Sequence, residues 1–156
     1  MVGSEFAAED QVFTSAEVCR IAKISSRQLQ WWDERHVVSP GRKAGRRTYR
    51  ARDVLQVLIV AALRGKGLSL QRIRRVLRLL RKDLDQRLDE YAGRDARLYL
   101  VTDCQAVHLD DDAHVVIERL AEARRPMYLI SLSDQLQRIH AERLYPSRDS
   151  RQLPLF

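Results

Sequence analysis

Two clusters of basic, amide and aromatic side chains lie close together between positions 25 and 49. Arginine, glutamine and serine hydrogen-bond to base edges and phosphates, lysine and arginine neutralise phosphates, and aromatic rings stack on sugars or contact thymine methyl groups. This chemistry predicts a surface that binds double-stranded DNA. The candidate DNA-binding residues are Ser26, Arg27, Gln28, Gln30 and Trp31 in the first cluster, and Arg42, Lys43, Arg46, Arg47 and Tyr49 in the second.

A helix followed by a hairpin would position these side chains. Ser25 is a typical helix cap, and the helix that it begins should end near Arg35, with Leu29 and Trp32 facing the core. The Ser-Pro-Gly at 39–41 breaks this helix, and Gly45 allows the tip of a basic hairpin to turn. A helix beside a basic hairpin is typical of a winged helix-turn-helix domain.

Three further helices should support this pair. Residues 14–23 begin with a capping pattern, in which Thr14 or Ser15 precedes Glu17. A third helix should run from Ala51 to the glycines at 65 and 67, and a fourth should begin after Ser69, with apolar residues at helical spacing up to Leu80. Together they predict a four-helix winged domain over 11–82.

The charge changes sign along the chain. Residues 11–82 hold 18 lysines and arginines and 4 acidic residues, a local charge of +14, whereas residues 83–156 hold 10 and 14, a charge of −4. This change predicts a linker or short helix over 83–95 and a separate small module over 96–145. Strand and helix patterns in the module give a β-β-α-β-α order with a mixed sheet, so the whole chain is predicted to be α+β. Residues 146–156 are predicted to form a flexible tail.

Other classes of protein fit the sequence poorly. Cys19 and Cys104 have no paired spacing, and no apolar run is long enough for a membrane span. The His and Asp residues between His108 and His114 do not have the spacing of metal ligands, and an aspartate run before a helix is ordinary capping. No catalytic grouping is present, so we expect a cytoplasmic protein with no enzyme activity, metal or cofactor.

Residues 13–80 resemble the DNA-binding domain of the MerR family of bacterial transcriptional regulators. The resemblance covers FTSAEVCRIAKISSRQLQWWDERHVVSP, GRRTYRARDVLQVL and LRGKGLSLQRIRRVLRLL. It implies a homodimer that binds an inverted repeat at a promoter, distorts the DNA and so engages RNA polymerase in the nucleoid.

The chain departs from the family pattern at several places. Lys23 replaces the usual glycine of the first turn, and Gln30-Trp31-Trp32 replaces the usual Arg-Tyr-Tyr of the recognition helix. The long dimerisation helix and the cysteine pair of the metal sensors are both missing. We therefore expect different base preferences, a differently built dimer and no metal sensing of that type.

Two features leave alternatives open. The fourth helix carries Arg72, Arg74, Arg75 and Arg78, which could extend the DNA contact or pair with acidic residues of the module. The tail ends in QLPLF, which resembles the pentapeptide that docks bacterial proteins on the sliding clamp, so Gln152, Leu153, Leu155 and Phe156 are candidate partner-binding residues. The alternative function is therefore a DNA-bending accessory protein of replication or recombination.

Overall fold

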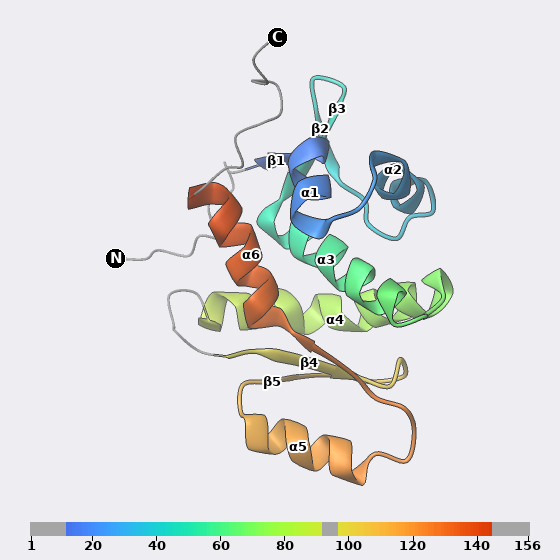
Figure 1. Cartoon of the computed structure of the whole chain (residues 1–156), viewed down its shortest axis with the longest axis vertical. Helices are drawn as coiled ribbons and strands as arrows, with labels where there is room; N and C mark the ends of the chain where they lie inside the picture. The colour runs from blue at the N-terminus through green and yellow to red at the C-terminus, as the bar shows by residue number, and fades with distance from the viewer. Residues whose placement is uncertain (1–11, 92–96, 145–156) are drawn as a thin grey trace, which may run out of the picture.

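The computed structural model describes residues 12–91 and 97–144, which form six helices and two three-stranded sheets (Figure 1). The elements of the first part are β1 (Val12–Thr14), α1 (Ser15–Ala22), α2 (Ser26–Glu34), β2 (Gly41–Lys43), β3 (Arg46–Arg50), α3 (Ala51–Gly65) and α4 (Leu70–Tyr91). The elements of the second part are β4 (Tyr99–Thr102), β5 (Val107–Asp110), α5 (Ala113–Glu122), β6 (Tyr128–Ser131) and α6 (Leu132–Leu144). This order agrees with the predicted four helices with a wing, followed by β-β-α-β-α.

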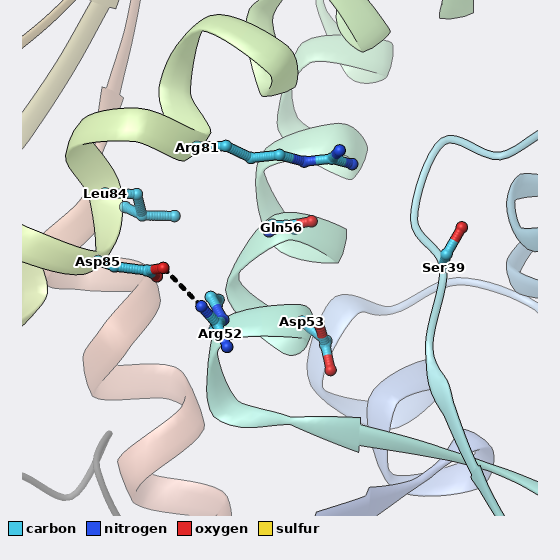
Figure 2. Close-up of a pocket in the computed structure, with 7 residues that line it drawn as sticks. All are labelled: Ser39, Arg52, Asp53, Gln56, Arg81, Leu84 and Asp85. Carbon is cyan, nitrogen blue, oxygen red and sulfur yellow. Dashed lines mark hydrogen bonds and ion pairs between the residues drawn. The ribbon is translucent and has the colours of Figure 1, made fainter.

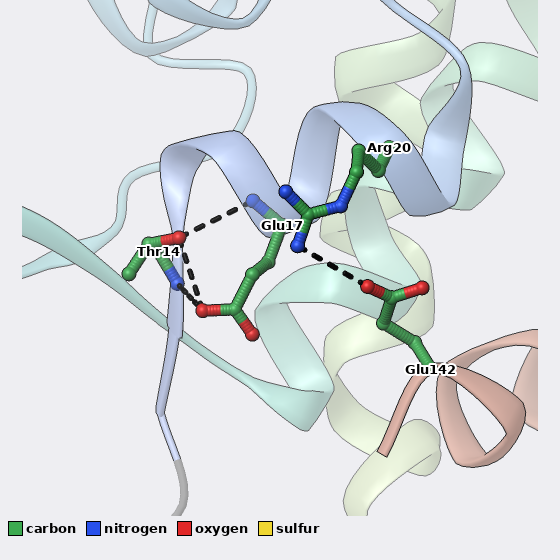
Figure 3. Close-up of polar contacts among 4 residues, drawn as sticks. All are labelled: Thr14, Glu17, Arg20 and Glu142. Carbon is green, nitrogen blue, oxygen red and sulfur yellow. Dashed lines mark hydrogen bonds and ion pairs between the residues drawn. The ribbon is translucent and has the colours of Figure 1, made fainter. Parts of the chain in front are cut away.

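Side-chain caps define where the first two helices begin. Thr14 and Glu17 form a reciprocal capping box, in which the Glu17 backbone N–H donates to Thr14 Oγ1 and Glu17 Oε1 accepts from the Thr14 backbone N–H (Figure 3). Ser25 Oγ accepts from the backbone N–H of Gln28 at 3.1 Å and caps α2. Both caps occur where the sequence predicted them.

The turn between α1 and α2 requires an unusual backbone conformation. Lys23 ends α1 with φ 56° and ψ 46°, in the left-handed region that glycine adopts without a steric penalty. Its backbone N–H still donates to the carbonyl of Cys19, as does that of Ile24. The lysine therefore occupies a glycine conformation in place of the usual glycine.

The basic hairpin, which we call the wing, consists of β2, β3 and the two residues between them. Ala44 and Gly45 both have positive φ, at 52° and 76°, as a two-residue hairpin turn of type I′ requires. β3 pairs with β2 on one side and with β1 on the other, and both pairs are antiparallel. The strand β1 was not predicted, because three residues are too few to show a periodicity.

Helix α4 continues through the region where the sequence predicted a linker or short helix over 83–95. It runs without a break to Tyr91, and Leu84 and Leu88 are buried in line with Leu77 and Leu80. The predicted boundary is therefore wrong for 83–91, because the apolar stripe continues although the net charge reverses. Residues 92–96 lie outside the described residues.

The second sheet has the order β5-β4-β6, and both of its pairings are antiparallel, which corrects the predicted mixed sheet. Helices α4 and α5 lie on opposite sides of this sheet (Figure 1). The side chains of Leu100 and Ile130 belong to the same buried cluster as those of α3 and α4. The second sheet thus packs on the helices of the first part.

Helix α6 returns from the second sheet to α1 and α3. Arg138 Nη2 donates to the carbonyl of Ile21 at the end of α1 at 2.6 Å, and Arg20 pairs with Glu142 at 3.3 Å (Figure 3). The first of these bonds satisfies a carbonyl that the helix end leaves open. The two predicted modules therefore share one core. No helix in the described ranges is long and apolar enough to cross a membrane.

Candidate nucleic-acid interface

Helix α2 presents one buried face and one exposed face. Leu29 and Trp32 are buried, as predicted, and Trp32 is fully enclosed. Ser26, Arg27, Gln30 and Trp31 are exposed, while Gln28 is half-buried and its backbone N–H is used by the Ser25 cap. The structure therefore gathers the five predicted residues of the first cluster on or near one accessible surface.

Interactions within α2 hold part of this surface in place. Gln30 Nε2 donates to Glu34 Oε1 at 2.9 Å, one turn later. The guanidinium of Arg35 lies over the ring of Trp31, 5.5 Å from its centroid, so this 38% exposed indole is supported by a cation–π contact. Arg27 makes no ion pair or hydrogen bond to another described residue, which leaves its guanidinium available.

The wing presents cations in two different states. Arg42, Lys43 and Arg46 are exposed. Arg47 is half-buried, and its Nε donates to Asp33 Oδ2 at 2.6 Å, while Arg42 Nη2 lies 3.9 Å from the same oxygen. This hydrogen bond raises the pKa of the Arg47 guanidinium. Asp33 is on α2, so the bond ties the wing to the recognition helix and fixes their relative orientation.

Tyr49 is not available for contact with DNA. It has no exposed surface, and it lies opposite Phe13 in the register of β1 and β3. Burial raises the pKa of its phenol. The prediction that Tyr49 binds DNA is therefore wrong for this structure: alternation along β3 points its ring into the core, between the sheet and α1.

A further element lies beside α2. Figure 1 shows the wing on one side of α2 and the turn between α3 and α4 on the other. Lys66 is exposed in this turn, Gly67 has φ 91°, and Arg64 Nη1 donates to the carbonyl of Leu68 at 2.9 Å. Lys66 is not among the predicted DNA-binding residues, although its position between Gly65 and Gly67 is a sequence signal for an exposed basic turn.

Of the two alternatives for the arginines of α4, pairing with acidic residues of the module is not seen among the described residues. Arg72 lies over the ring of Tyr128 in β6, 5.9 Å from its centroid. Arg74, Arg75 and Arg78 are exposed and make no ion pair with the residues that the structure describes. A contact between these arginines and DNA stays a prediction.

The acidic run before α5 has structural roles. Asp112 Oδ1 accepts from the backbone N–H of His114 at 2.8 Å and caps α5, and Asp110 pairs with Arg119 at 2.7 Å. No group of three potential metal ligands is found within 12–91 and 97–144. The candidate partner-binding residues Gln152, Leu153, Leu155 and Phe156 lie outside the described residues.

An exposed helix start beside a basic wing, on a support of packed helices, defines a winged helix-turn-helix DNA-binding domain. Residues 13–80 match the family model described as MerR HTH family regulatory protein. This segment is therefore a MerR-family DNA-binding domain, as its sequence resemblance predicted. No curated protein matches the chain.

Proposed function

We propose that this protein is a sequence-specific transcriptional regulator that binds an inverted repeat as a homodimer and acts by distorting the DNA. It would act in the cytoplasm, on the nucleoid, with RNA polymerase as its partner at the promoter and without enzyme activity or a cofactor. The observation that carries the proposal is the exposed guanidinium of Arg27, which has no partner among the described residues and lies beside the exposed wing cations within a MerR-family segment.

The two clusters would have different tasks. Arg27 is the side chain best suited to a bidentate contact with guanine, and Gln28 and Gln30 could read neighbouring bases in the major groove. Ser26 and Trp31 would contact the adjoining backbone. Arg42, Lys43, Arg46 and Lys66 would bind phosphates on either side of the recognition helix, which sets the register without reading sequence.

Asp33 would determine which guanidinium groups of the wing are available to bind phosphates of the DNA. Its carboxylate holds Arg47 and lies within ion-pair distance of Arg42. A phosphate that approaches the wing therefore competes with Asp33 for the same guanidinium groups. This competition favours sites at which the DNA is shaped so that Arg47 can keep its bond to Asp33.

Support for a dimer built by the second module comes from its exposed apolar side chains. Ile117 is 61% exposed on α5, and Leu120 and Leu129 are 37% and 38% exposed. Helix α5 lies at the opposite end of the molecule from the wing (Figure 1), so a contact there would leave both recognition helices free. Ile117→Glu should convert the dimer to a monomer in sedimentation equilibrium, whereas Glu118→Gln on the same helix should not.

The function is tested by binding purified protein to a library of genomic fragments at increasing salt. We expect enrichment of an inverted repeat that lies between promoter elements, and loss of this enrichment in Arg27→Gln. Arg124→Gln removes the same charge from an exposed position in the module and is the matched control. Binding without sequence preference or salt dependence would refute the proposal, and sites away from promoters would favour the accessory role.

A further inference from the structure

A pocket of about 390 Å³ lies between α3, α4 and the loop that precedes the wing. Its lining residues are Ser39 from the loop, Arg52, Asp53 and Gln56 from α3, and Arg81, Leu84 and Asp85 from α4. Figure 2 shows the Arg81 side chain extending from α4 towards the loop, with the α3 side chains beside it. None of these residues belongs to the predicted DNA-binding clusters.

Gln56 is the unusual member of this group. It is only 8% exposed, yet its amide has no hydrogen-bond partner among the described residues. The residues around it on α3, from Val54 to Val60, are otherwise apolar and buried. The amide is not among the enclosed polar atoms that lack a partner, so it keeps access to solvent where Gln56 lines the pocket. A bound molecule could therefore replace water as the hydrogen-bond partner of this amide.

The charges of the pocket indicate the chemistry of this molecule. Arg52 Nη1 is already paired with Asp85 Oδ2 at 2.5 Å, and Asp53 Oδ2 accepts from the backbone N–H of Arg50 at 2.9 Å as a helix cap. Arg81 has no ion-pair partner in the part of the chain that the structure describes. The available groups are therefore one guanidinium, one amide and the Ser39 hydroxyl. This set suits a ligand with one anionic group and a second hydrogen-bonding group.

We propose that this pocket binds a small organic anion, with its carboxylate or phosphate on Arg81 and a polar group on the Gln56 amide. Guanidinium binds both kinds of anion through paired hydrogen bonds, and the volume falls within the range of small-molecule sites. Binding would connect α4 to the loop before the wing, because Arg81 lines the pocket from α4 and Ser39 lines it from the loop. The site itself does not depend on DNA binding; only its regulatory consequence rests on the proposed function.

The same anionic chemistry could come from a free metabolite or from a DNA backbone phosphate, and two measurements separate these sources. The first is a titration of the full-length protein with inorganic phosphate and with succinate, followed by NMR of the Gln56 side-chain amide and the Arg81 Nε–H. We expect saturable shifts of both signals with at least one probe. Arg81→Gln should weaken the apparent affinity about tenfold or more, which corresponds to the loss of one charged hydrogen bond.

Arg78→Gln is the matched control, because Arg78 is an exposed arginine on the same helix that does not line the pocket and forms no ion pair within 12–91 and 97–144. A second variant, Gln56→Leu, should weaken probe binding by several-fold, less than Arg81→Gln does, while unfolding at the same or a higher urea concentration than the wild type. A glutamine that serves the fold would instead make this variant less stable, and that result would count against the site.

The second measurement is the salt dependence of DNA binding in the absence of any probe. A free-ligand site leaves the slope of log affinity against log salt unchanged in Arg81→Gln. A slope lowered by about one, together with no probe binding, would assign Arg81 to a DNA phosphate and overturn the proposal. Absence of saturable shifts with both probes would overturn it as well.

Discussion

The left-handed conformation of Lys23 predicts that Lys23→Gly stabilises the protein. An L-residue in this region of the backbone costs about 1–2 kcal/mol, because its Cβ is close to the following carbonyl oxygen. Glycine avoids this cost but loses about 0.5–1 kcal/mol through the greater freedom of the unfolded chain. The Lys23 side chain is exposed and makes no hydrogen bond or ion pair with the described residues. The expected net gain in free energy of unfolding is about 0.5–1 kcal/mol.

Urea unfolding followed by tryptophan fluorescence measures this gain, since the enclosed Trp32 should become exposed on unfolding. A chain of this size should also melt about 1–4 °C higher. Lys23→Ala is the control: it removes the same charge and keeps both the Cβ and the strained backbone, so its stability should be close to that of the wild type. If the glycine variant is no more stable than the alanine variant, the argument from backbone strain is refuted.

Three further changes test the interface and the module. Arg46→Gln should lower the salt slope of DNA binding by about one, measured by fluorescence anisotropy with a random duplex, and an unchanged slope would exclude a phosphate contact. Asp33→Asn should lower the free energy of unfolding by about 1–3 kcal/mol, because it weakens a half-buried ion pair with Arg47. The same variant should bind the duplex more tightly at low salt, because it frees wing charge. Weaker binding would show that Asp33 mainly positions the wing. The backbone N–H groups of Ala106 and Gln105 donate to the Asp103 carboxylate and lower its pKa. The ionised carboxylate therefore stabilises the folded state at pH values above the unfolded pKa of about 4. This stabilisation is lost as the pH falls through the lower folded pKa. Asp103→Asn should therefore reduce the loss of stability as the pH falls below about 4 in urea titrations, and an unchanged pH profile would contradict this assignment.

Local signals were sufficient to predict most elements of the fold. Each of these signals lies within four residues of the structure that it determines. Thr14 and Ser25 begin helices, and Gly45 allows the wing to turn. The recognition helix could be oriented for the same reason, because the spacing of Leu29 and Trp32 identifies its buried face.

The errors arose where the outcome depends on distant parts of the chain. Strand β1 pairs with the edge of β3 that β2 leaves open, and this pairing places Phe13 beside the buried Tyr49. The three residues of β1 are too few for the sequence to predict this pairing. The position of β6 beside β4, which makes the second sheet wholly antiparallel, also depends on packing against α3. The predicted boundary after Lys82 is wrong for a different reason: the net charge reverses there, but Leu84 and Leu88 continue the buried apolar stripe of α4.

The length of α4 has a mechanical consequence. Its 22 residues make a rod of about 33 Å that begins at the turn beside the recognition helix and ends beyond the pocket of Arg81 and Leu84. A tilt of about 5° about one end of such a rod moves the other end by about 3 Å, which is the full length of a hydrogen bond. A small displacement at the pocket or the second sheet would thus be magnified along α4 into the gain or loss of a phosphate contact at Lys66.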